Sequence, residues 1–371
     1  SKIHQTSILD ASKKTFEANL VFALCREYPN EYGEKIANIA LNTHVNQCGQ
    51  ATLAAAEASR ENGNSPNTVV SGAVAIVGKK MVESAMDASN ILVDLFQFSK
   101  LNNAMDSFNY DEQLKTAKAN KDTFLAGPDD KLSDSVAACL SKDTQSVFIK
   151  FLLDFSKQEG GKPSTDAMIA AIWTTLGWSG MKSKKITKGT IGRLPWYSRI
   201  YSTIVGVAAS ADKHGEGSFC GIELGELISG FSFTRTAFLS LMGREPTDDE
   251  LFEFQVLLGL IITNGPGTIS AQGSKGAVSA DGPEMPDRVQ VNKAFIGFLT
   301  HTGFAHGGNG YEAAAFLIEQ FKDTSLKAAD DKNHGLDLDA MALDYSKKYK
   351  DYKSEQKAMG NLEYAKVPCI N

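Results

Sequence analysis

The chain has 371 residues, with 38 Lys or Arg against 44 Asp or Glu, so its formal charge at pH 7 is −6. This mild acidity argues against nucleic acid as the main partner, because phosphate binding needs a concentrated excess of Lys and Arg. Hydrophobic residues make up 42% of the chain and charged residues 22%, which is typical of a globular protein of two or three domains. No apolar run approaches the roughly 18–20 residues of a membrane span, so we expect no membrane partner.

The sequence also predicts a cytoplasmic location. Residues 1–20 scatter charged residues among the apolar ones and lack the continuous apolar core of a signal peptide. An odd number of widely spaced cysteines is typical of a reduced protein without a disulfide framework. These cysteines are Cys25, Cys48, Cys139, Cys220 and Cys369. His44 and Cys48 stand four residues apart on an expected helix, but a third ligand is lacking, so no metal site is predicted.

Apolar residues recur every three or four positions through the first half of the chain, which predicts helices. The expected helical segments are 7–28, 32–62, 68–101, 111–125, 132–158 and 164–178. The segment 68–101 is long enough for one helix that spans the domain or for two helices that meet near Gly78. Stretches that alternate polar and apolar residues are nearly absent, so the predicted fold class is all-α with sheets as a minor part.

A break in the helical pattern near residues 178–192 predicts a domain boundary. We expect residues 1–180 to form an N-terminal helical region of unassigned role and residues 181–371 to form a second helical domain. The break contains Lys182, Lys184, Lys185 and Lys188. A solvated linker is the favoured interpretation of this basic run, and contact with the phosphates of a coenzyme is the alternative.

The second half begins with two expected short helices, 223–230 and 231–242. Thr247 and Glu250 then form a capping box, in which the Thr hydroxyl accepts from the backbone and the Glu reaches back. The following helix, 251–262, is apolar nearly all round, so we expect it to be buried centrally or in a subunit interface.

Small residues fill the stretch 264–287, and further helices are expected over 288–300, 311–321 and 337–357. In the last of these, acids stand at the start and lysines toward the end. That order suits the helix dipole and indicates a solvent-exposed helix.

Two polar residues stand next to glycines at expected helix ends: Asn264 after one helix, and His306 before Gly307 and Gly308. Glycines allow the backbone to approach a ligand closely. A histidine at a helix N-terminus tends to be neutral, and it could donate a hydrogen bond to a carbonyl oxygen that becomes an enolate. From this local chemistry alone, a histidine that merely caps a helix is an equally good interpretation.

Several segments carry a resemblance to a known family. They read Gly225-Glu226-Leu227-Ile228, Phe231-Ser232-Phe233, Leu239-Ser240-Leu241-Met242-Gly243-Arg244-Glu245-Pro246-Thr247, Asn264-Gly265-Pro266-Gly267-Thr268-Ile269-Ser270-Ala271 and Gly303-Phe304-Ala305-His306-Gly307-Gly308. In this order and spacing they resemble the citrate synthase superfamily over about residues 186–321. The variant resembled most is the citryl-CoA lyase module of ATP-citrate lyase, which also has Gly-Pro at the position of Gly265-Pro266.

The resemblance implies a citrate synthase-like large domain with an additional N-terminal helical region. It implies an acyltransferase or lyase that forms or cleaves a carbon–carbon bond between acetyl-CoA, or another acyl-CoA, and a dicarboxylic 2-oxo acid such as oxaloacetate. His306 would be catalytic and polarise the thioester carbonyl, while Asn264, Gly307 and Gly308 would bind substrate. Asn264 falls where the family usually has a histidine that holds carboxylates, which leaves the identity of the acid open. Coenzyme A would enter as part of the substrate, with no bound cofactor.

The family also uses a second histidine, an arginine and a catalytic aspartate, and these residues should follow the position where this sequence stops. Enolate formation needs a base, and no residue here is assignable as one. We therefore expect a homo- or hetero-oligomer in which another chain supplies the family's C-terminal part. Two alternatives remain open: a catalytically silent regulatory or scaffolding subunit, and an unrelated helical interaction protein.

Overall fold

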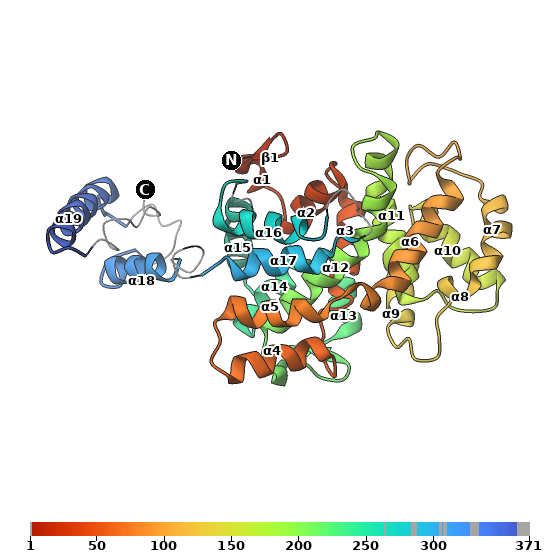
Figure 1. Ribbon diagram of the computed structural model, residues 1–371, viewed down its shortest axis with the longest axis horizontal. Helices are drawn as coiled ribbons and strands as arrows, with labels where there is room; N and C mark the ends of the chain where they lie inside the picture. Colours follow the sequence, from red (N-terminus) through yellow and green to blue (C-terminus); the bar gives the residue numbers. More distant parts are fainter. Residues whose placement is uncertain are drawn as a thin grey trace. The chain divides into compact units, whose positions relative to one another are not determined.

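A computed structural model of the chain is all-α, as the periodicity predicts (Figure 1). It describes residues 2–262, 265–282, 288–303, 306, 310–326 and 334–361. Within these ranges the strands are two residues long and form two antiparallel pairs, β1 (Lys2–Ile3) with β2 (Thr6–Ser7) and β3 (Ser218–Phe219) with β4 (Ile222–Glu223). The expectation that sheets are a minor part of the fold is confirmed for this part of the chain.

The chain divides into two compact units, residues 1–300 and 301–371. The predicted boundary at residue 180 falls between α11 (Thr165–Lys182) and α12 (Lys188–Ala208), which pack against each other inside the first unit. The compact units therefore differ from the division into 1–180 and 181–371. Both helices bury most of their length, including Trp173 and Trp196, so a division between them would expose their shared core.

The basic run between these two helices is held by the rest of the first unit. Lys185 pairs with Glu27 at 2.8 Å, Lys188 pairs with Asp94, and the Lys182 ammonium lies over the Trp178 ring. The run is therefore a short connection whose lysines largely have partners within the chain.

The first six helices agree with the predicted helical segments in part. They are α1 (Ile8–Ala11), α2 (Phe16–Cys25), α3 (Glu31–Asn42), α4 (Ala51–Glu61), α5 (Pro66–Ile76) and α6 (Glu83–Phe96). The two-helix alternative for 68–101 holds, because α5 and α6 meet around Gly78 and the 3-10 turn Lys79–Met81. The expected helix 32–62 is instead α3 and α4, separated by residues 43–50.

The next helices are α7 (Asp111–Ala117), α8 (Lys121–Phe124), α9 (Ser133–Ser141) and α10 (Val147–Gln158). With α3, α6 and α11 they enclose an aromatic core. Phe96 contacts Phe148 and Phe151 edge-to-face, and Trp178 packs on Phe148 while its indole N–H donates to the Leu101 carbonyl at 3.1 Å. Satisfying the polar end of a buried Trp lets the ring lie fully inside.

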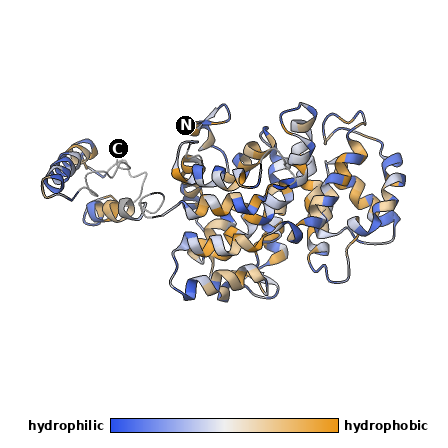
Figure 2. Cartoon of the chain, in the orientation of Figure 1, coloured by the Kyte–Doolittle hydropathy of each residue, from blue (hydrophilic) through white to orange (hydrophobic). Residues whose placement is uncertain are grey.

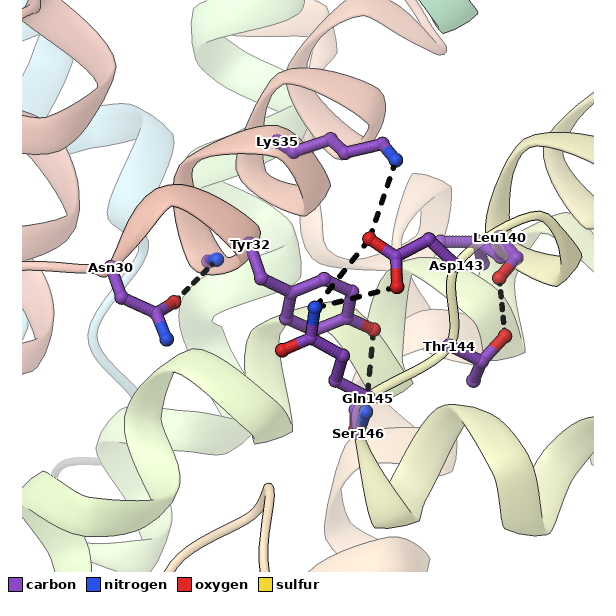
Figure 3. A network of polar contacts seen from close by, with 9 residues as sticks. Asn30, Tyr32, Lys35, Leu140, Asp143, Thr144, Gln145 and Ser146 are labelled. Atoms are coloured by element: carbon purple, nitrogen blue, oxygen red, sulfur yellow. Dashed lines mark hydrogen bonds and ion pairs between the residues drawn. The ribbon is translucent and has the colours of Figure 1, made fainter.

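Polar contacts fix α3 against the connection between α9 and α10 (Figure 3). The Tyr32 hydroxyl accepts a hydrogen bond from the Ser146 backbone N–H at 3.3 Å, and Lys35 pairs with Asp143 at 3.7 Å. Tyr32 is buried, so the hydroxyl satisfies a backbone donor that would otherwise be costly to bury.

The remaining helices of the first unit are α13 (Leu224–Gly230), α14 (Phe233–Met242), α15 (Asp248–Ile261), α16 (Ile269–Ser279) and α17 (Val291–Thr300). Helices α16 and α17 lie side by side (Figure 1). Their backbones approach closely at Gly273 and Gly297, since a Cβ on Gly297 would lie 2.5 Å from the Gly273 carbonyl oxygen. Helix α17 also packs on α5 and α12, which joins this pair to the core.

The second unit contains α18 (Gly310–Phe321) and α19 (Leu338–Ala358). Helix α19 is largely hydrophilic, whereas the helices of the first unit carry long hydrophobic runs (Figure 2). The Asp337 side chain caps α19 by accepting from Ala340 N at 2.9 Å, and no residue of this helix is buried. The predicted solvent-exposed helix at 337–357 is confirmed.

Helix α15 departs from its prediction. It begins at the predicted capping box, but Gly259 is the one buried residue within it, and Phe252 and Ile261 are 64% and 63% exposed. The helix packs on α1, α2 and α14, and the described residues of the first unit leave large apolar side chains of α15 uncovered. Central burial is therefore wrong, and the alternative, a subunit interface, stays a prediction.

Candidate functional site

The Leu-rich turn that carries part of the family resemblance is built around Gly243. This residue ends α14 with φ +68°, a left-handed conformation that favours glycine, and its N–H donates to the Leu239 carbonyl at 2.8 Å. The Thr247 hydroxyl accepts from Glu250 N at 3.3 Å, and the Glu250 carboxylate accepts from Thr247 N at 2.9 Å. The Arg244 guanidinium also donates to Glu250. The predicted capping box is confirmed, and it sets the start of α15.

The first predicted glycine segment leads into α16. The Thr268 side chain caps this helix by accepting from Ala271 N at 3.4 Å. Gly265 has φ +79°, which fits a tight turn before the helix. Asn264 lies outside the described residues.

His306 lies in the second unit, in a close backbone turn. Its N–H donates to the Gly303 carbonyl and its carbonyl accepts from Gly303 N, both at 3.0 Å. The side chain is half-buried, and α18 begins four residues later. Gly307 and Gly308 lie outside the described residues, so the substrate-binding roles expected for Asn264, Gly307 and Gly308 stay predictions.

A cleft of about 1090 Å³ opens elsewhere, in the first unit, among α6, α8, α11, α12 and the segment after α3. His44, Asp166 and Arg199 line it and also line a small chamber of about 20 Å³ that adjoins it. These three side chains come from distant parts of the chain: the turn after α3, the first turn of α11, and the middle of α12.

The N-terminus of α11 is held in place at this cleft by the segment before α9. Asp130 accepts from Thr165 N at 2.7 Å and from the Thr165 hydroxyl at 2.6 Å, while Ser164 caps the helix by accepting from Ala167 N. A carboxylate in the first turn of a helix is favoured by the helix dipole, which suits Asp166.

Burial dominates the electrostatics of the three inner residues. It raises the pKa of Asp166, although the Arg199 charge opposes this, and it lowers the pKa of Arg199, although the Asp166 charge opposes that. Burial and the Arg199 charge lower the pKa of His44 well below its usual range, so this imidazole is neutral at pH 7. The Nε of Arg199 is buried and has no hydrogen-bond partner among the described residues.

His44 and Cys48 both line this cleft, but not as one helix face, because α3 ends at Asn42. The expectation that they share a helix is therefore wrong. In the described ranges there is no group of three or more His, Cys, Asp and Glu side chains arranged to hold a metal ion.

Asp166 and Arg199 were not singled out from the sequence. A signal was present for Arg199, since it stands between the buried residues Trp196 and Ile200 in an apolar helix pattern. A charged residue on a buried face marks a functional candidate with a physical rationale.

No known protein family, curated protein or solved structure matches this chain. Across the part of the chain that the structure describes, no helix combines the length and apolarity that a membrane crossing requires.

Proposed function

We propose that the chain takes part in citrate synthase-type carbon–carbon bond formation or cleavage between acetyl-CoA and a 2-oxo acid such as oxaloacetate. The observation that carries the proposal is the ordered series of local structures over residues 224–279. A helix pair ends at Gly243 in a left-handed turn, a capping box at Thr247 starts α15, and a capped small-residue helix, α16, follows. These elements contain the first four of the segments in which the sequence resembles the family.

In this reaction the α-carbon of the thioester loses a proton to a base, and the resulting enol attacks the carbonyl carbon of the 2-oxo acid. His306 would donate a hydrogen bond to the thioester oxygen and stabilise the negative charge that develops there. Asn264 would hold a carboxylate, and the backbone at Gly307 and Gly308 would allow the substrate to approach. Coenzyme A is the carrier part of the substrate.

The proposal includes a second chain, in a homo- or hetero-oligomer, that supplies the base. An exposed apolar side of α15 supports this, because Leu257, Leu260 and Ile261 follow helical spacing and give it a hydrophobic surface of the kind that interfaces bury.

A catalytically silent regulatory or scaffolding subunit is the second candidate. The replacement of the family's usual histidine by Asn264 favours it, because Asn cannot carry the positive charge that binds a dicarboxylate strongly. Calorimetric titration of the chain with coenzyme A and with oxaloacetate separates the two candidates. Binding of neither compound would favour the silent subunit.

The test of the proposed function is His306→Ala in the native assembly, assayed by consumption of acetyl-CoA and oxaloacetate. We expect turnover to fall by roughly 10²–10³, the range for loss of one oxyanion donor, with an unchanged circular dichroism spectrum. His301→Ala is the matched control, because His301 is an exposed histidine of the same unit five residues earlier. Unchanged turnover in His306→Ala would remove this residue from the mechanism.

A further inference from the structure

The cleft in the first unit has an arginine at its inner end and exposed carboxylates at its rim. Arg199 lies at the inner end, beside Asp166 and the neutral His44, where these residues also border the small adjoining chamber. The rim carries the exposed carboxylates Asp87 and Asp122 from α6 and α8, together with Asp129 from the segment before α9.

The inner end holds polar groups that the chain leaves incompletely paired. The Nε of Arg199 is buried without a hydrogen-bond partner in the described part of the chain. A buried donor without a partner costs free energy, and a carboxylate ligand would satisfy the guanidinium in a fork geometry. The carboxylate of Asp166 lies close enough to Arg199 to affect its pKa, and it could accept from a ligand ammonium.

The charge at the rim decides which charge is favoured on the outer end of a ligand. Among the described residues, Lys131 is the one cationic side chain at the rim, and it pairs with Glu216 at 3.5 Å. Three further carboxylates then face the cleft and would repel a second anionic group, which disfavours phosphates and dicarboxylates. A cationic group on the ligand would be favoured at this position.

We propose that this cleft binds a free α-amino acid with a cationic side chain. Arg199 holds the α-carboxylate, Asp166 holds the α-ammonium, and the side-chain cation extends toward Asp87, Asp122 and Asp129. His44, as a neutral ring, contributes a hydrogen bond and no charge. The cleft uses none of the residues proposed for carbon–carbon bond chemistry, so this proposal and that function can fail separately.

The test is calorimetric titration of the full chain with L-arginine and L-lysine. Three comparators each remove one recognised group from L-arginine: agmatine lacks the carboxylate, Nα-acetyl-L-arginine lacks the α-ammonium, and L-citrulline lacks the side-chain charge. We expect L-arginine or L-lysine to bind. The dissociation constant of every comparator should be at least about ten times that of L-arginine. Absence of binding by both amino acids up to about 10 mM, or equal binding of agmatine, would overturn the proposal.

Variants locate the site. Arg199→Gln should weaken L-arginine binding by about tenfold or more, whereas Lys188→Gln, which removes a charge from the half-buried start of the same helix, should not. Because Arg199→Gln could disturb the fold, the triple variant Asp87→Asn/Asp122→Asn/Asp129→Asn changes exposed residues alone and should remove the preference for L-arginine over L-citrulline. A preference that survives the triple variant, or tighter binding of succinate or inorganic phosphate than of either amino acid, contradicts the assignment.

Discussion

Glu17 is a carboxylic acid in the core of the first unit. Its side chain is fully buried in α2, with Oε2 accepting from the Thr234 hydroxyl at 2.6 Å and Oε1 lacking a partner among the described residues. Burial raises the pKa of Glu17, against the lowering effect of the Thr234 hydrogen bond. A half-paired buried carboxylate is costly when it is charged.

This environment predicts how stability responds to pH. Because the folded chain holds the Glu17 proton more tightly than the unfolded chain does, the contribution of Glu17 to stability falls as pH rises above about 4.5, through the folded pKa. Glu17→Gln lacks this titration. Its unfolding free energy relative to wild type should therefore improve with pH, by about 1.4 kcal/mol for each unit by which the pKa is raised.

Urea unfolding between about pH 4 and pH 8 measures this trend. Glu83→Gln, at the exposed start of α6, is the control. A constant offset between Glu17→Gln and wild type across this range would show that burial does not raise the pKa of Glu17.

The sequence was least informative about which individual side chains meet in the folded chain. His44 was noticed through its spacing from Cys48, but its partners Asp166 and Arg199 are 122 and 155 residues away in the chain. Helical periodicity indicates which positions share a face, and it says nothing about which distant faces meet. His306 was singled out from its glycines, and the structure adds its turn with Gly303.

Among the helices, α12 makes an unusually close backbone contact. A Cβ on Gly206 would lie 2.1 Å from the Val45 carbonyl oxygen and 2.9 Å from Gln47 Cγ. His214 joins the same region, since its Nδ1 accepts from Gln47 N at 3.0 Å and its Nε2 lies 3.1 Å from the Gly206 carbonyl. The segment after α3, which carries His44, is thus held directly against α12.

Gly206→Ala should therefore destabilise the fold by about 2–3 kcal/mol or more, because backbone atoms must shift to make room. Gly72→Ala is the matched helical change. Its added Cβ meets nothing nearer than the Ala55 carbonyl oxygen at 3.8 Å, so it should stabilise by about 0.5–1 kcal/mol. Denaturant unfolding of both variants checks the pair, and a Gly206→Ala protein as stable as wild type would refute the close contact.

Helix starts were more predictable than helix interruptions. The capping box at Thr247 is a local signal, and the structure starts α15 there as predicted. The interruption between α3 and α4 was missed, because Ala and Leu flank residues 43–50 on both sides and mask a break that depends on tertiary contacts with His214 and α12.

For the whole molecule, the uncovered side of α15 predicts self-association or binding of a related chain. Leu257→Glu/Ile261→Glu should reduce the mass measured by light scattering, to about half for a dimer, because both side chains lie on one side of α15 and a charge in an apolar interface is costly. Phe98→Glu is the control, since Phe98 is 93% exposed and lies on the connection after α6. A wild-type chain that light scattering shows to be a monomer, bound to no other chain, would contradict the interface.

The all-α fold class was predictable because helical periodicity pervades the sequence. The division after Thr300 was not, because it reflects how α17 packs on α5 and α12, and the breaker cluster near residue 180 is a turn within one core. The prediction that α15 is buried centrally was wrong for a related reason. Apolar composition predicts that a surface is covered, but it does not indicate which chain covers it.

The core of the first unit joins the beginning of the chain to residues made much later. The Asn42 side chain donates to the Phe231 carbonyl at 2.8 Å across 189 residues of sequence, and α3 shares its hydrophobic cluster with α13 and α14. A ribosome that adds about 5–20 residues per second needs about 10–40 s to synthesise that interval. Throughout this time α3 lacks the part of its packing that α13 and α14 supply, so we expect the growing chain to depend on chaperones that shield early helices until residue 239 has emerged.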